Sequence, residues 1–82
     1  MRDKILNELN HIFHQVIGRD DVILKIETES KDITLWDSII HIRFIIAIEV
    51  FYKIRISPGE IIEWKNIGSI CECIQKKISK QT

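Results

Sequence analysis

The sequence predicts an all-α fold, a four-helix up-down bundle of three longer helices and one short third helix, with a long loop after the first. Apolar residues recur at helical spacing near both ends of the chain, and helix start signals precede three segments. The chain has 82 residues, which suit the single domain that we expect over residues 1–82. A domain of this size buries roughly 60% of its unfolded surface, so no separate catalytic domain fits.

Residues 4–17 carry the clearest helical pattern, with apolar positions separated by four, three and four residues. Polar side chains occupy the opposite side of this predicted helix. Gly18 follows as a left-handed stop. The recurring apolar residues are Ile5, Leu9, Ile12 and Val16.

Residues 18–36 are harder to assign. Val22, Leu24 and Ile26 alternate with other positions, a pattern that is typical of a short strand. No second strand is available elsewhere to pair with it. Unstructured connections of this length are uncommon in small domains, and those that occur are usually functional.

Residues 38–56 allow two interpretations, because apolar β-branched residues fall on alternate positions as they do in a strand. The intervening positions are also apolar, and the run exceeds the usual strand length. We therefore predict a helix over residues 38–52. Its expected inward-facing residues are Ile42, Ile45 and Ile48, with Phe51 or Tyr52.

Two further helices have clear start signals. Ser57-Pro58-Gly59-Glu60 is a capping box with proline at the first helical position. Ile61, Ile62 and Trp64 supply the apolar contacts of this short helix. Asn66 then caps the final helix, in which Cys71 is expected to be a small core residue. The apolar positions of that helix are Ile67, Ile70 or Cys71, Ile74 and Ile78.

Ser38 is the candidate functional residue. Asp37 is a natural N-cap for the helix that begins at residue 38, so the hydroxyl of Ser38 lies at the positive end of the helix dipole. A phosphate ester at this position is favoured by about 0.3 to 1 kcal/mol, the usual gain for an anion at an exposed helix start.

The segment Trp36-Asp37-Ser38-Ile39 resembles the Asp-Ser-Leu signature of acyl carrier proteins, including the tryptophan that precedes it in many of them. Downstream, Ile45-Ile46-Ala47-Ile48-Glu49 lies where the family has an apolar run ending in Ala-Leu-Glu. Tyr52 lies where the family has phenylalanine, and Ile56-Ser57-Pro58 enters the short helix. The resemblance covers residues 36–78 with the motif, and residues 1–35 by length and pattern.

This resemblance implies that Ser38 carries 4′-phosphopantetheine through a phosphodiester, with Asp37 and Ile39 flanking the attachment. A phosphopantetheinyl transferase would load the group from coenzyme A with a divalent metal. Acyl-loading and acyl-using enzymes of a fatty-acid, polyketide or specialised pathway would be the later partners, and no residue of this chain need be catalytic. The family also has a long first loop with apolar residues packed onto the bundle, a role that we assign to Val22, Leu24, Ile33 and Leu35.

The predicted second helix departs from the family pattern, which is usually acidic there. Residues 37–56 contain Asp37 and Glu49 against Arg43, Lys53 and Arg55, a net charge of +1. Partners should therefore use apolar contact, or an acidic patch facing Arg43. The docking residues that we expect are Trp36, Ile40, Arg43 and Phe44, although an isoleucine-rich composition also scatters apolar residues on surfaces.

Composition excludes several classes of partner. Twelve Lys and Arg residues balance twelve Asp and Glu residues, which argues against nucleic-acid binding. No apolar run approaches transmembrane length, so we expect a cytoplasmic monomer with reduced cysteines. His11 and His14 have no neighbouring ligands, and no metal site is expected. Two other functions remain open, an aminoacyl or peptidyl carrier and a helical interaction module without a prosthetic group.

Overall fold

The computed structural model describes residues 2–80, and helices are the only regular elements in that range. The all-α prediction is therefore confirmed. In chain order the elements are α1 (Arg2–Ile17), the 3₁₀ turn η1 (Ser30–Asp32), α2 (Ser38–Tyr52), α3 (Pro58–Ile62) and α4 (Ile67–Lys80).

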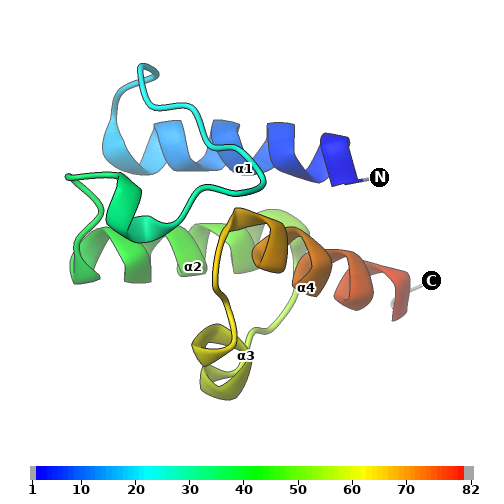
Figure 1. Cartoon of the computed structure of the whole chain (residues 1–82). Coiled ribbons are helices and arrows are strands. Elements are labelled where there is room, and N and C mark those ends of the chain that lie inside the picture. The colour runs from blue at the N-terminus through cyan, green and yellow to red at the C-terminus, as the bar shows by residue number, and fades with distance from the viewer. Residues whose placement is uncertain (1, 81–82) are drawn as a thin grey trace.

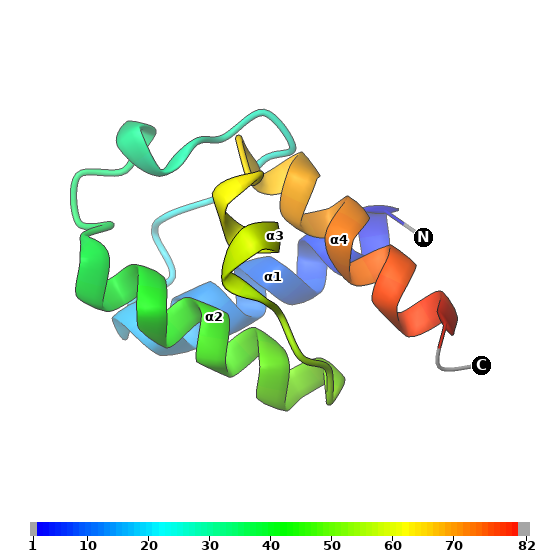
Figure 2. The same ribbon diagram turned by 90° about the horizontal axis from the view of Figure 1, so that it is seen from below.

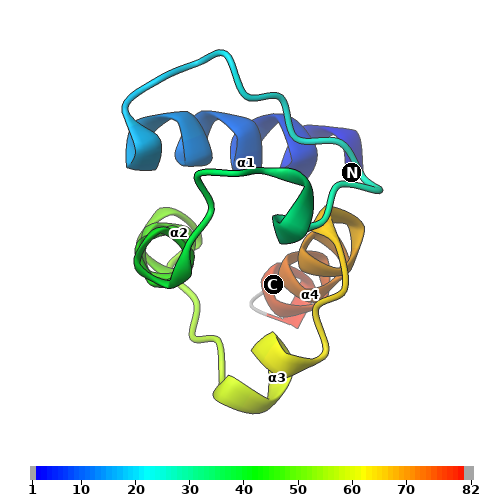
Figure 3. The same cartoon turned by 60° about the vertical axis from the view of Figure 1, so that its left-hand side comes forward.

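α1 packs against both α2 and α4 and runs antiparallel to α2 (Figure 1). The connection through α3 carries the chain back across the molecule, so that α4 runs in the same general direction as α2 (Figure 2). Figure 3 shows α3 on the side of the molecule away from α1. The loop between α1 and α2 crosses to the start of α4 and returns, which places the start of α2 at one end of the molecule (Figure 1).

Local sequence signals set the ends of the helices as predicted. Gly18 adopts a φ of 72°, the left-handed conformation that glycine tolerates best. The carboxylate of Asp37 accepts a hydrogen bond from the backbone N–H of Ile40 at 2.9 Å. Ser57 forms the expected capping box with Glu60, and Asn66 Oδ1 accepts from the N–H of Ser69 at 2.9 Å.

The extended stretch around Leu24 has a side chain as its partner instead of a second strand. Asn10 of α1 accepts from the N–H of Leu24 at 2.6 Å and donates to its carbonyl oxygen at 3.0 Å. Both backbone groups are thereby satisfied while the side chain of Leu24 is buried. The predicted packing of the first loop is confirmed, because Val22, Ile33 and Leu35 also lie against the core.

The loop is also bound to the start of α4. The N–H groups of Ile67 and Gly68 donate to the carbonyl oxygens of Thr28 and Ile26, at 2.9 and 2.8 Å. A Cβ atom on Gly68 would lie only 2.8 Å from Cγ2 of Ile26. Glycine is therefore needed here for the close approach of the loop.

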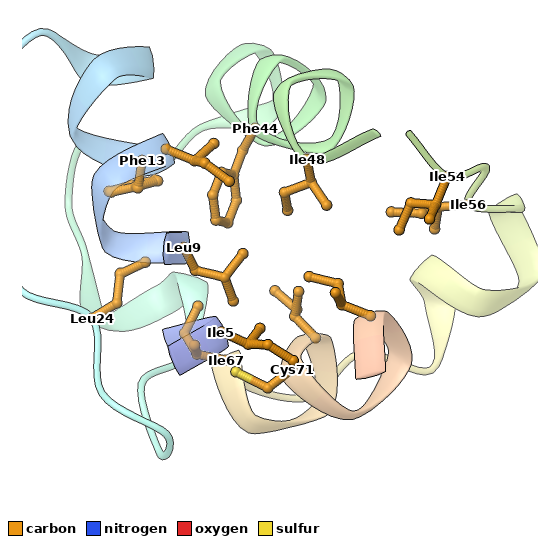
Figure 4. Packing of buried hydrophobic residues seen from close by; sticks show 13 residues of the cluster. Ile5, Leu9, Phe13, Leu24, Phe44, Ile48, Ile54, Ile56, Ile67 and Cys71 are labelled. Atoms are coloured by element: carbon orange, nitrogen blue, oxygen red, sulfur yellow. The ribbon is translucent and has the colours of Figure 1, made fainter. Parts of the chain in front are cut away.

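The hydrophobic core lies between α1, α2 and α4 (Figure 4). Phe13 and Phe44 meet edge to face in it, with ring centroids 5.1 Å apart. Cys71 is fully buried, as predicted. The largest fully buried side chains are Phe13, Phe44, Leu9, Leu24, Ile48, Ile67, Ile74 and Cys71.

The predicted inward face of α2 is partly wrong. Ile42 was expected in the core but is 56% exposed, whereas Phe44 is fully buried. Ile48 is buried as predicted, and Ile40 packs against the core. The ring of Phe44 packs against those of both Phe13 and Trp36, and these aromatic contacts fix which side of α2 faces inward.

The short helix α3 contacts the core through one of its two isoleucines. Ile62 was expected to contact the core from α3, but it is 83% exposed. Its neighbour Ile61 packs against the core as predicted. The helix containing Ile61 and Ile62 has only five residues, so a single inward position is enough to attach it.

Candidate functional site

Ser38 is the first residue of α2 and is exposed to solvent. Asp37 satisfies the N–H of Ile40 with its side chain and that of His41 with its carbonyl oxygen, at 2.9 Å in both cases. The N–H groups of Ser38 and Ile39 have no acceptor within the helix. The hydroxyl therefore lies beside unpaired donors at the positive end of the helix dipole, where an anion is stabilised.

The residue that positions this helix start is Trp36. Its ring packs against Phe13 and Phe44, with centroids 4.9 and 5.4 Å away. Asp37, the N-cap residue of α2, follows Trp36 directly in the chain. The core thus fixes the place of Ser38 at the end of the molecule, although the hydroxyl itself is accessible.

A shallow hollow of about 250 Å³ borders Ser38. Trp36 and His41 form part of its wall, together with the cap residue. The full lining consists of Ser30, Trp36, Asp37, Ser38 and His41.

His41 is the residue of this site that sequence reasoning missed. Its Nδ1 accepts a hydrogen bond from Nε1 of Trp36 at 3.1 Å. Burial lowers the pKa of the His41 imidazole below its ordinary value of 6.5. The available sequence signal was the spacing of three residues from Ser38, which places both side chains on neighbouring positions of one helix.

The structure separates the four docking residues expected from the sequence. Phe44 is fully buried in the core, so its expected role in docking is corrected. Trp36 and Ile40 are half-buried and pack against the same core. Arg43 is exposed, as a docking residue must be.

A different apolar surface lies next to Ser38. Four exposed residues at spacings of three, four and four form a continuous stripe along α2, here called the α2 stripe. Arg43 lies on the same side of the helix by this spacing. The stripe consists of Ile39 (60% exposed), Ile42 (56%), Ile46 (53%) and Val50 (73%).

Glu49, the acidic residue of α2, lies beside the C-terminal half of this stripe, where it lines a hollow with Ile46 and Val50. Glu49 accepts a hydrogen bond from the N–H of Ile56 at 2.9 Å, which ties its carboxylate to the connection that leads to α3. The exposed charges beside the α2 stripe are the guanidinium groups of Arg43, near Ser38, and of Arg55, which lines the hollow with Ile46 and Val50.

Comparison with known proteins finds a similar chain among the solved structures. Neither family models nor curated proteins match the sequence. Among solved structures, the chain is similar to a holo acyl carrier protein from Geobacter metallireducens, whose structure was determined by NMR in solution. The two are 38% identical, and the alignment covers 93% of this chain and 87% of that one with a TM-score of 0.87. No helix in residues 2–80 combines the length and apolarity required to cross a bilayer.

Proposed function

The chain belongs to the acyl carrier protein family, and we propose that Ser38 is the residue through which it carries a 4′-phosphopantetheine arm. The observation that supports this role most strongly is the exposed hydroxyl of Ser38 at the capped, positive end of α2. The related protein from Geobacter metallireducens is described as a holo protein, which agrees with such a group in this family.

The residues around Ser38 fit a phosphodiester. The N–H groups of Ser38 and Ile39 are free of intrahelical acceptors, and the adjoining hollow offers space on the outer surface. The carboxylate of Asp37 is occupied by the N–H of Ile40. Its negative charge is thus partly compensated by the helix start, which limits repulsion of a neighbouring phosphate.

Attachment uses the hydroxyl of Ser38 as the nucleophile. Its oxygen forms a new bond to the phosphorus of coenzyme A that bears the pantetheine, and the pyrophosphate bond breaks. Adenosine 3′,5′-bisphosphate leaves, and the serine proton passes to a base of the transferase. The attached group supplies a terminal thiol on which an acyl group is carried as a thioester. The chain itself contributes position and access, and we propose that it is a carrier and not an enzyme.

We propose that partner enzymes dock on the α2 stripe. The stripe starts beside Ser38, so an enzyme that reaches the arm also meets Ile39 and Ile42. An exposed apolar surface flanked by Arg43 fits an apolar partner surface with carboxylates at its rim. An apolar stripe with Arg43 beside it differs from the usually acidic second helix of the family, which favours partners in a specialised pathway. An aminoacyl or peptidyl cargo remains the second candidate, because the stripe would contact the partner enzyme and not the cargo.

The proposal is tested by incubating the protein with coenzyme A and a broad-specificity phosphopantetheinyl transferase and measuring the intact mass. We expect the wild type to gain one phosphopantetheine group and Ser38→Ala to gain none. Ser30→Ala is the matched control, because Ser30 lines the same hollow but lies outside α2. No gain on the wild type would favour a helical interaction module, and an undiminished gain on Ser38→Ala would reject Ser38 as the site.

A further inference from the structure

We propose that His41 holds the phosphodiester at Ser38, with the Nε2–H of its imidazole donating a hydrogen bond to a phosphate oxygen. This inference rests on the proposed function of Ser38 and adds a second residue to the same site. In this role His41 would orient the phosphate at the point where the arm is attached to the protein.

The position of His41 is suited to this role. It follows Ser38 by three residues on α2, so the two side chains are neighbours on the helix surface, with Cβ atoms about 5 to 6 Å apart. Both line the hollow of about 250 Å³ at the helix start. A phosphate on the hydroxyl of Ser38 would lie within reach of the imidazole.

The hydrogen bond from Trp36 determines which imidazole nitrogen carries the proton. An indole N–H can only donate, so Nδ1 of His41 must accept and the proton of the neutral ring lies on Nε2. Trp36 is itself fixed by Phe13 and Phe44, so the ring orientation is set from the core. Among residues 2–80, no acceptor is found for Nε2 of His41, which leaves this donor available to a ligand.

The pH titration of His41 can report its contact with the phosphate, because the other charged groups near the imidazole are few. Asp37 faces it in the hollow beside Ser38, and Lys65 faces it across the small cleft between the first loop and the start of α4. Burial favours the neutral imidazole in the protein without the group. Asp37 and Lys65 are the same before and after loading, so a change in the titration of His41 reports the added phosphate.

The experiment is a pH titration of the histidine ring signals by NMR, before and after loading with phosphopantetheine. We expect loading to raise the pKa of His41 by about half a unit to one unit, because a negative charge about 5 Å away favours the imidazolium. His11, which is exposed on α1 and pairs with Gln15, is the internal control in the same spectra.

A second measurement follows the phosphorus itself. A phosphodiester does not titrate near neutral pH. Its ³¹P resonance should therefore change with pH only if His41 gains or loses a proton beside it. We expect a midpoint equal to the pKa of His41 in the wild type and no such step in His41→Gln, which keeps an N–H donor but cannot titrate.

The outcomes separate this inference from the proposed function. A loaded protein in which the pKa of His41 is unchanged and the ³¹P resonance is independent of pH overturns the role of His41, while Ser38 stands. Absence of loading in the wild type overturns both.

Discussion

Nε1 of Trp36 donates a hydrogen bond to Nδ1 of His41 across 3.1 Å. The bond joins the last residue before the cap of α2 to the first turn of the helix, on either side of Ser38. Because the ring of Trp36 packs on Phe13 and Phe44, the site is connected to the core by one side chain. Packing in the core therefore determines the orientation of the imidazole at the surface.

Replacing Trp36 by phenylalanine keeps an aromatic ring in the core but removes the donor. The Trp36 hydrogen bond stabilises the neutral form of His41, so its loss should raise the pKa of His41 in the unloaded protein. An NMR pH titration of Trp36→Phe against the wild type measures this change. A pKa that stays the same or falls would show that the bond does not control the protonation of His41.

The N-cap at Asp37 should contribute measurably to stability. Asp37→Ala leaves the N–H of Ile40 without its side-chain acceptor and should lower the free energy of unfolding by about 1 kcal/mol, within the range of 0.5 to 2 kcal/mol for such caps. Urea denaturation provides the measurement. Asp37→Asn is the matched control, since asparagine caps helices equally well, and equal losses in both variants would refute the capping role.

The ends of the helices could be predicted because their signals are local. Asp37, Ser57 and Asn66 each accept from a backbone N–H three residues away, and Gly18 needs only its own φ. These residues define the boundaries without reference to the rest of the chain.

The inward face of α2 could not be predicted in the same way. Its apolar residues occupy nearly every position, so several faces fit the helical period equally well. The choice between Ile42 and Phe44 depends on the rings of Phe13 and Trp36, which come from other segments. For the same reason the Trp36–His41 bond could not be predicted, although the motif made Ser38 the candidate residue.

The observed face of α2 predicts unequal costs for two neighbouring substitutions. Phe44→Ala removes a fully buried ring and should destabilise the protein by about 3 to 5 kcal/mol. Ile46→Ala changes a residue that is 53% exposed and should cost well under that, within about 1 kcal/mol. Denaturant midpoints measure both, and Phe44→Leu serves where the alanine variant does not fold. A larger cost at Ile46 would contradict the observed face.

Protonation of Glu60 should lower the stability of the folded protein in acid. Its carboxylate lies 2.9 Å from Nζ of Lys77 and accepts from Ser57, which lowers the pKa of Glu60 from 4.5 to about 2. Because this pKa is lower in the folded protein, the contribution is complete above pH 4.5 and is lost as the pH falls toward 2. The contribution is small, since the pair is partly exposed to solvent.

The measurement is urea denaturation of the wild type and Glu60→Gln at about pH 7 and about pH 3. The difference in stability between the two proteins should be greatest at the higher pH and shrink at the lower one. A difference that grows on acidification would contradict the ion pair and the cap.

The α2 stripe should affect loading without affecting the fold. Ile46→Ser on the stripe should lower kcat/KM for the transferase by about five- to tenfold, equivalent to roughly 1 to 1.4 kcal/mol. Ile23→Ser is the matched control, because Ile23 is 62% exposed but lies in the first loop. Equal effects of the two substitutions would show that the transferase does not recognise the stripe.

We propose that one serine at the start of α2, Ser38, bears the prosthetic group. Fragment mass spectrometry of the loaded protein can locate the group, because the five serines of the chain lie on separable fragments. We predict that the added mass resides on Ser38 alone. Added mass on Ser30, Ser57, Ser69 or Ser79 with Ser38 unmodified would reject Ser38 as the attachment site.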